Sequence, residues 1–362
     1  MLHTTNENSN SNECKITFII GNGFDLNLGM KTSYADIYET YVITPSKSDV
    51  IAAFKQELSN RRRYDKWADF EMGMAEYARS FRDENEFIQC IRDFKVHMVK
   101  HLEMENEQIG KKLLSTNFEP GITFVLESAL HHFHEGLTPN VSNQIAKMWK
   151  GKDKSFGFLT FNYTDTLSLV FSAAEEFLRL RCKLTDVHLN PGILHIHGSL
   201  MNDVVLGVDN ETQLNGLPYH LSVRGKRAFI KPYFNEQYDA QRILQARQMI
   251  EESSIICIFG FSMGATDQMW VDQLAEWLRR DIHHHLLYFE YDPNTYARCN
   301  SDELMDVEEA KKARLLERLG FSSTDEIAAQ VHIPIGKKIF DFNLTKGIKE
   351  FEEEVMARSS LD

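Results

Sequence analysis

Short apolar runs, each followed by turn-forming residues, recur along the chain and predict the strands of a parallel sheet. Helical patterns follow several of these runs. One example has apolar residues at Trp270, Leu274, Trp277 and Leu278, which fits a helix that Thr266 or Asp267 could cap. This alternation predicts an α/β fold with a Rossmann-like parallel sheet. The expected strands are Ile16–Ile20, Phe156–Phe161, Ile193–Ile196, Val204–Leu206, Ile255–Phe259, Leu286–Tyr291 and Gln330–Pro334.

The stretch from 45 to 150 has a different pattern, with apolar residues only at helical spacing. One stripe runs from Trp67 to Phe81 and another from Phe87 to Leu102. We therefore predict a large helical insertion at 45–150 within an α/β domain formed by 15–44 and 151–362, with 1–14 a disordered tail. Further helices are expected at Asp302–Leu319 and Ile348–Met356. Glu71 lies within the first stripe, although a solvated carboxylate is the simpler interpretation.

Composition narrows the class of protein. The 362 residues are 43% apolar, enough for a substantial core, and carry a net charge of −13. That charge argues against broad nucleic-acid binding, despite the short basic run Arg61–Arg63. Five scattered cysteines, with no closely spaced pair, fit a reducing compartment. With neither a signal peptide nor an apolar run of the roughly 20 residues that span a membrane, a cytoplasmic protein without membrane contact is expected.

Glycines mark the end of the first expected strand, in the stretch Gly21–Gly29. Glycine allows a backbone to approach a nucleotide closely, because it lacks a Cβ atom. The spacing matches neither the usual dinucleotide fingerprint nor a P-loop. From this segment alone, a phosphate cradle and a plain strand-ending turn are both open.

Polar residues and glycines also follow three other expected strands. The segments are Thr160–Asp165, His195–Ser199 and Gly260–Asp267. Ligands of open parallel sheets bind beyond the carboxyl ends of the strands, where these segments converge. The sequence therefore predicts one composite site at this edge.

At this point the residues resemble known families. The run from Gly21 to Asp25, with Gly29, Thr32 and Tyr34 downstream, is similar to the amino-terminal signature of the AbiH family of phage abortive-infection proteins. The motif order also resembles the sirtuin-like fold, with a glycine turn, a Thr-x-Asn-Tyr segment that starts at Thr160, a His-Gly segment and a Gly-x-Ser segment. The resemblance covers about 15–295, apart from the insertion.

The sirtuin-like resemblance implies NAD as the ligand, with catalytic Asn162 and His197 beside the nicotinamide ribose. It also implies a cofactor-binding set formed by Gly21, Asn22, Gly23, Asp25, Thr160, Ser262 and Asp267. Asp25 and Asp267 could hold the ribose or only fix loops. Deacylating sirtuins carry paired zinc-binding cysteines after the His-Gly segment, whereas Ser199–Pro232 contains no cysteine. The resemblance therefore favours hydrolysis of NAD over protein deacylation and implies no metal.

Two other functions stay open. His195 and His197 share one face of a strand and, with Asp209 and another carboxylate, could bind the metal of a nuclease or phosphohydrolase. The glycine turns could instead bind a nucleotide that is sensed and never cleaved. The run His283–His285 is expected to lie at a strand edge on the surface. Because a constitutive NAD hydrolase would harm its host, activation by homo-oligomer assembly, by a phage product or by movement of the insertion is also open.

Overall fold

The computed structural model describes residues 13–60, 67–113, 119–135, 137–181, 187–289, 301–334, 339–340 and 342. Within these residues six parallel strands form one sheet of order β3-β2-β1-β4-β5-β6, which confirms the predicted Rossmann-like α/β class. The order reverses between β1 and β4, at the centre of the sheet. The strands are β1 (Glu13–Ile20), β2 (Asp153–Thr160), β3 (Val187–His195), β4 (Ile255–Phe259), β5 (His285–Phe289) and β6 (Val331–His332).

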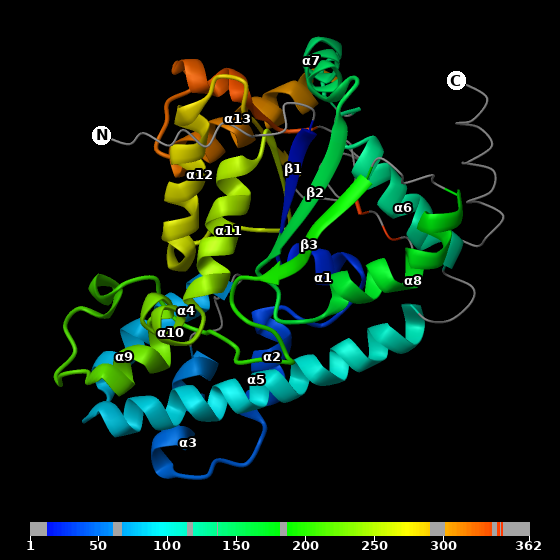
Figure 1. Ribbon diagram of the computed structural model, residues 1–362. Coiled ribbons are helices and arrows are strands. Elements are labelled where there is room, and N and C mark those ends of the chain that lie inside the picture. The colour runs from blue at the N-terminus through cyan, green and yellow to red at the C-terminus, as the bar shows by residue number, and fades with distance from the viewer. Residues whose placement is uncertain are drawn as a thin grey trace, which may run out of the picture.

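Helices cover both faces of the sheet, as Figure 1 shows. Apolar residues from alternate positions of β1 contribute to the two layers: Phe18 packs with the first group of helices and Ile19 with the second. Burial on both faces explains why the sequence of β4 is apolar throughout. The first group is α6 (Glu119–His131), α7 (Pro139–Trp149) and α8 (Thr166–Arg181), and the second is α11 (Ala240–Glu252), α12 (Gln268–Arg280) and α13 (Ser301–Arg318).

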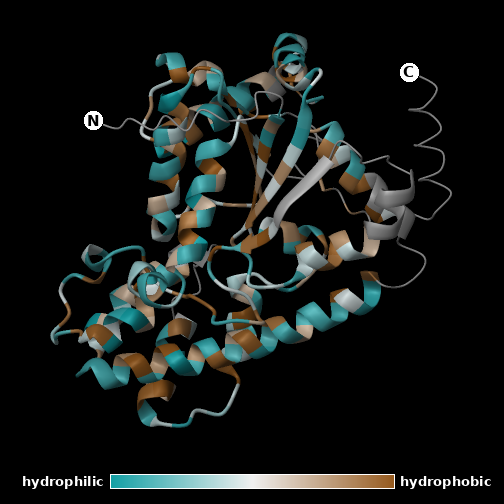
Figure 2. Ribbon diagram, in the orientation of Figure 1, coloured by the Kyte–Doolittle hydropathy of each residue, from teal (hydrophilic) through white to brown (hydrophobic). Residues whose placement is uncertain are grey.

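A third group of helices lies beyond the carboxyl ends of the strands (Figure 1). It has its own buried core, to which α5 contributes the whole predicted stripe from Phe87 to Leu102. In Figure 2, α5 carries apolar and polar residues along its length, as an amphipathic helix does. We call this group the helical lobe: α2 (Tyr34–Val42), α3 (Asp49–Asn60), α4 (Trp67–Tyr77), α5 (Glu84–Leu113), α9 (Val223–Phe229) and α10 (Lys231–Tyr238).

The helical lobe draws on two separated parts of the chain. Helices α9 and α10 come from after β3, whereas α6 and α7, from the predicted insertion at 45–150, pack on the sheet. The short helix α1 (Gly23–Asn27) follows β1 directly and leads into the lobe. None of the described helices is both long and apolar enough to cross a membrane.

The structure also corrects the sequence expectations in places. The run Val204–Leu206 is not a strand. All three side chains are buried, Val204 and Leu206 in the core of the helical lobe, and burial accounts for their apolar character. Strand β1 begins at Glu13, three residues before the predicted start. Of the predicted surface histidines His283–His285, only His283 is exposed, since His284 stacks on Trp277 and His285 contacts His332. The predicted helix at Ile348–Met356, the tail up to residue 12 and Arg61–Arg63 lie outside the described residues.

Candidate functional site

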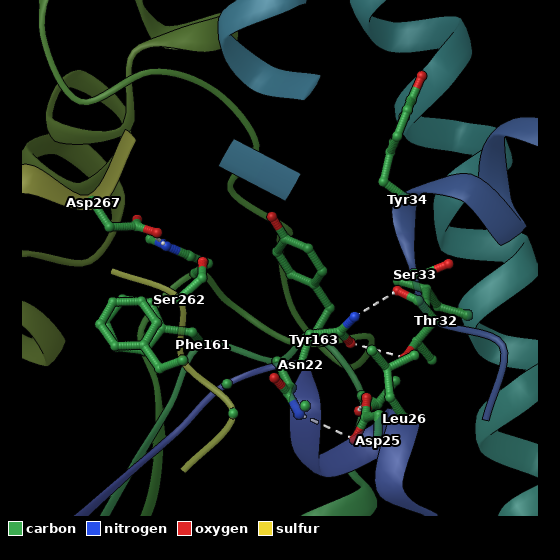
Figure 3. Close-up of a pocket in the computed structure, with 18 of the residues that line it drawn as sticks. Asn22, Asp25, Leu26, Thr32, Ser33, Tyr34, Phe161, Tyr163, Ser262 and Asp267 are labelled. Atoms are coloured by element: carbon green, nitrogen blue, oxygen red, sulfur yellow. Dashed lines mark hydrogen bonds and ion pairs between the residues drawn. The ribbon is translucent and has the colours of Figure 1, made fainter. Parts of the chain in front are cut away.

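A cavity of about 410 Å³ lies at the carboxyl ends of the central strands, where the strand order reverses. Open α/β sheets bind their ligands at such a point of reversal, beyond the carboxyl ends of the strands. Figure 3 shows Asp25 and Thr32 on one side of the cavity and Ser262 and Asp267 on the other. Both the sheet and the helical lobe contribute to its wall, whose polar residues include Asn22, Asp25, Glu71, Asn162, His197, Lys231, Ser262 and Asp267.

The glycines of the first turn bring two backbones together. The amides of Gly21 and Gly23 donate to the carbonyls of Phe259 and Gly260, at 2.9 and 3.0 Å. A Cβ atom on Gly21 would lie 2.4 Å from the oxygen of Gly260, so no other residue fits. The turns after β1 and β4 are thereby joined at the centre of the sheet. The phosphate cradle stays a prediction, and it would need donors other than these two amides.

The side chain of Asn22 forms its hydrogen bonds with the loop that follows α1. Its side-chain amide donates to the carbonyl of Thr32 at 3.0 Å and accepts from the hydroxyl of Thr32 at 2.8 Å. Both groups of the amide are therefore used within the protein. This pair fixes the path of the chain from the glycine turn into the helical lobe.

Asp25 is buried and accepts hydrogen bonds from Asn162 Nδ2 at 3.0 Å and from the hydroxyl of Thr164 at 2.6 Å. Burial raises the pKa of Asp25 to about 6, although the hydrogen bonds from Thr164, Thr166 and Asn162 oppose the rise. Because the nitrogen of the Asn162 amide faces Asp25, its oxygen points elsewhere. That oxygen, Asn162 Oδ1, is buried and has no hydrogen-bond partner.

His197 forms a pair with Asp267 on the other side of the cavity. Its Nε2 lies 2.8 Å from Asp267 Oδ1, while its Nδ1 is buried without a partner. Burial and the charge of Lys231 lower the pKa of His197, outweighing the opposite effect of Asp267. A neutral imidazole that donates Nε2–H to Asp267 leaves a lone pair on Nδ1. The pair thus presents a hydrogen-bond acceptor.

Two charged residues that the sequence did not assign to the site complete this cluster. Lys231 is buried and contacts Asp267 Oδ1 at 2.9 Å and Glu71 Oε2 at 3.0 Å. Glu71 is only 3% exposed, so its interpretation as a solvated carboxylate was wrong. The position of Glu71 within the apolar stripe of α4 was the feature of the sequence that indicated its burial. No feature of the sequence indicated that Lys231 belongs to the site, because a single lysine beside a proline is part of no motif.

The remaining predicted residues take different places. Ser262 lines the cavity and is exposed. Thr160 acts through Asn162, whose backbone N–H donates to the Thr160 hydroxyl at 3.1 Å. The three residues of the metal hypothesis, His195, His197 and Asp209, do not form a metal-binding group, and no other three His, Cys, Asp or Glu side chains in the described part of the chain do so.

Comparison with known proteins assigns the family. The family model for bacteriophage abortive infection AbiH matches residues 17–288. The chain belongs to the AbiH family. It is therefore a phage abortive-infection protein, as its amino-terminal signature predicts, and the matched range includes every site residue named above. No curated protein matches the chain. The sirtuin-like resemblance stays a prediction.

Proposed function

We propose that this AbiH protein hydrolyses NAD to nicotinamide and ADP-ribose at the cavity beyond β1 and β4, and that loss of NAD stops phage replication. The observation that carries the proposal is the presence of two buried, unpartnered acceptors in the wall of one cavity, Asn162 Oδ1 and His197 Nδ1. Unpaired buried polar atoms are costly, and a bound water or ligand would remove that cost. Water and ribose hydroxyls are donors that would satisfy both.

The chemistry needs few groups. The bond between the ribose C1′ and the nicotinamide nitrogen breaks, its electron pair stays on nitrogen, and neutral nicotinamide leaves without needing an acid. Water adds to the positively charged C1′ and releases one proton. His197 Nδ1 can take that proton as general base, and Asn162 Oδ1 can orient the water. The negative charge of Asp25 would favour the cationic transition state above its pKa of about 6.

The test follows nicotinamide release by the purified full-length protein incubated with NAD. We expect release to fall at least about a hundredfold in His197→Ala and Asn162→Ala. Matched controls are His283→Ala and Asn202→Ala, which change exposed residues of the same types and should retain activity.

Because a phage product could be the activator, the assay is repeated with extract from infected cells. No release in either condition would exclude NAD hydrolysis. Saturable NAD binding without cleavage, seen as a rise in melting temperature, would favour the nucleotide-sensing alternative.

A further inference from the structure

Four ionisable side chains form a continuous buried chain from the helical lobe to the cavity. Glu71 on α4 contacts Lys231 on α10, Lys231 contacts Asp267 in the turn after β4, and Asp267 contacts His197 after β3. The three contacts measure 3.0, 2.9 and 2.8 Å. Side-chain exposure is only 4% for Glu71, 5% for Lys231 and 6% for His197. The chain therefore joins four segments that lie far apart in the sequence.

Lys231 has a complete set of partners. Its ammonium group donates to Glu71 Oε2, to Asp267 Oδ1 and to the carbonyl of Thr266, the last at 3.0 Å. An ammonium group has three donors, so none is left over for a ligand. Burial lowers the pKa of Lys231, but Asp267 and Glu71 outweigh it and keep the amine charged. Lys231 is thus built into the protein as a fixed buried cation.

Glu71 is fixed equally firmly on the side of the lobe. Its second oxygen accepts from the amide of Gly207 at 3.0 Å. Gly207 has a φ of +147°, and a Cβ there would lie 2.0 Å from the carbonyl oxygen of Phe229, so only glycine fits. The next residue, Val208, accepts from the Lys231 amide at 2.9 Å. Backbone groups of Gly207 and Val208 therefore hold both members of the ion pair, Glu71 and Lys231, in position.

The charges in this chain act on His197 with opposite signs. Asp267 favours the protonated imidazolium, whereas Lys231 disfavours it, and so does Arg242 on α11. Glu71 offsets the charge of Lys231, because the two form an ion pair. Tyr163, whose ring lies 6.5 Å from that of His197, stays neutral since burial raises its pKa well above 10. Removal of Lys231 should therefore protonate His197 more easily, and removal of Glu71 less easily.

We propose that Lys231 and Glu71 are positioning residues through which the helical lobe keeps His197 neutral, with Nε2–H on Asp267 and no proton on the buried Nδ1. Lys231 holds Asp267 in place through their ion pair. Its positive charge also offsets the negative charge of Asp267, which would otherwise favour protonation of His197. Glu71 positions the ammonium group of Lys231, so the protonation state of His197 depends on the position of α4. This inference rests on the proposed function in treating His197 as the base. Its test does not need NAD.

The test is a pH titration of His197 by NMR in protein with isotope-labelled histidine, assigned with His197→Gln. The two contacts through Asp267 put Lys231 Nζ within about 6 Å of Nε2. At an effective dielectric constant of about 20, a charge at that distance shifts a pKa by roughly two units. We expect Lys231→Met to raise the pKa of His197 by about that amount. Glu71→Gln should lower it by a smaller amount, because Glu71 is one contact further away.

The matched controls come from an exposed ion pair of the same types, Lys226 and Glu211, at 2.8 Å. Lys226→Met and Glu211→Gln should leave the His197 titration unchanged. If Lys231→Met does not fold, the double variant Glu71→Gln/Lys231→Met, which leaves no unpaired member of the ion pair, should still raise the pKa of His197.

A purely structural role predicts no such pattern. Equal shifts in the two single variants, shifts of the same sign, or an Nδ1–H tautomer in the unmodified protein would overturn the proposal. The expected NMR shifts without any cleavage of NAD would instead refute only the proposed reaction. Cleavage of NAD with an unmoved His197 titration would refute only the positioning role.

Discussion

Asp25 should make the protein less stable as the pH rises, and Asp25→Asn should remove that effect. The pKa of Asp25 rises from 3.8 to about 6 on folding, chiefly because burial disfavours its charge. Unfolding therefore releases a proton between these values, and the carboxylate lowers stability increasingly from about pH 4 upward. Asparagine has almost the same shape and can keep both hydrogen bonds, since the Thr164 hydroxyl can rotate to accept.

The size of the effect follows from the two pKa values. Each pKa unit corresponds to about 1.36 kcal/mol, so the full cost of the ionised carboxylate is about 3 kcal/mol. At pH 4.5 only about 1 kcal/mol of this cost is present, and at pH 7.5 nearly all of it. The stability of the unmodified protein relative to Asp25→Asn should therefore fall by about 2 kcal/mol between these pH values.

The assay is chemical denaturation of both proteins across this pH range. Only the difference in unfolding free energy is used, because all other titrating groups are shared and cancel. A difference independent of pH, or one that favours the unmodified protein at high pH, would refute the reasoning. It would mean that the hydrogen bonds of Asp25 outweigh its burial.

Two further substitutions test the turn after β1. We expect Gly21→Ala to lower the free energy of unfolding by at least about 3 kcal/mol, since its Cβ meets the backbone of Gly260 at 2.4 Å. Gly110→Ala, inside α5, has room for a methyl group and should be neutral or stabilising; equal losses in urea denaturation would contradict this account. Asn22→Asp would set a carboxylate against the carbonyl of Thr32, so it should destabilise more at pH 7.5 than at pH 4.5, and thermal melts showing the reverse order would refute it.

Much of the sheet could be predicted from local pattern. The run Ile255–Phe259 coincides with β4 because a strand buried on both faces must be apolar throughout. The same reasoning failed for Val204–Leu206, which is buried although it pairs with no strand. An apolar run in the sequence therefore predicts that a segment is buried. Whether the segment forms a strand depends on the backbone that lies beside it in the fold.

The candidate site was predictable where it follows strand ends. Asn162 and His197 line one cavity because parallel strands end at one edge, whatever lies between them in the sequence. Lys231 and the burial of Glu71 were not predictable in this way. Both are buried as members of one ion pair, and that pair joins residues 160 positions apart in the chain, which no local pattern reveals.

The turn after β4 is held at both ends by different parts of the molecule. At its start, Gly260 is pressed against the glycine turn of β1. At its far end, the guanidinium of Arg318 on α13 donates to the carbonyls of Met263 and Gly264, at 2.6 and 2.9 Å, and Met263 keeps a left-handed φ of 51°. Between these anchors the exposed Ser262 faces the cavity. A ligand would thus meet a turn whose backbone is fixed on both sides of Ser262, so the Ser262 side chain could adjust to the ligand without movement of the turn.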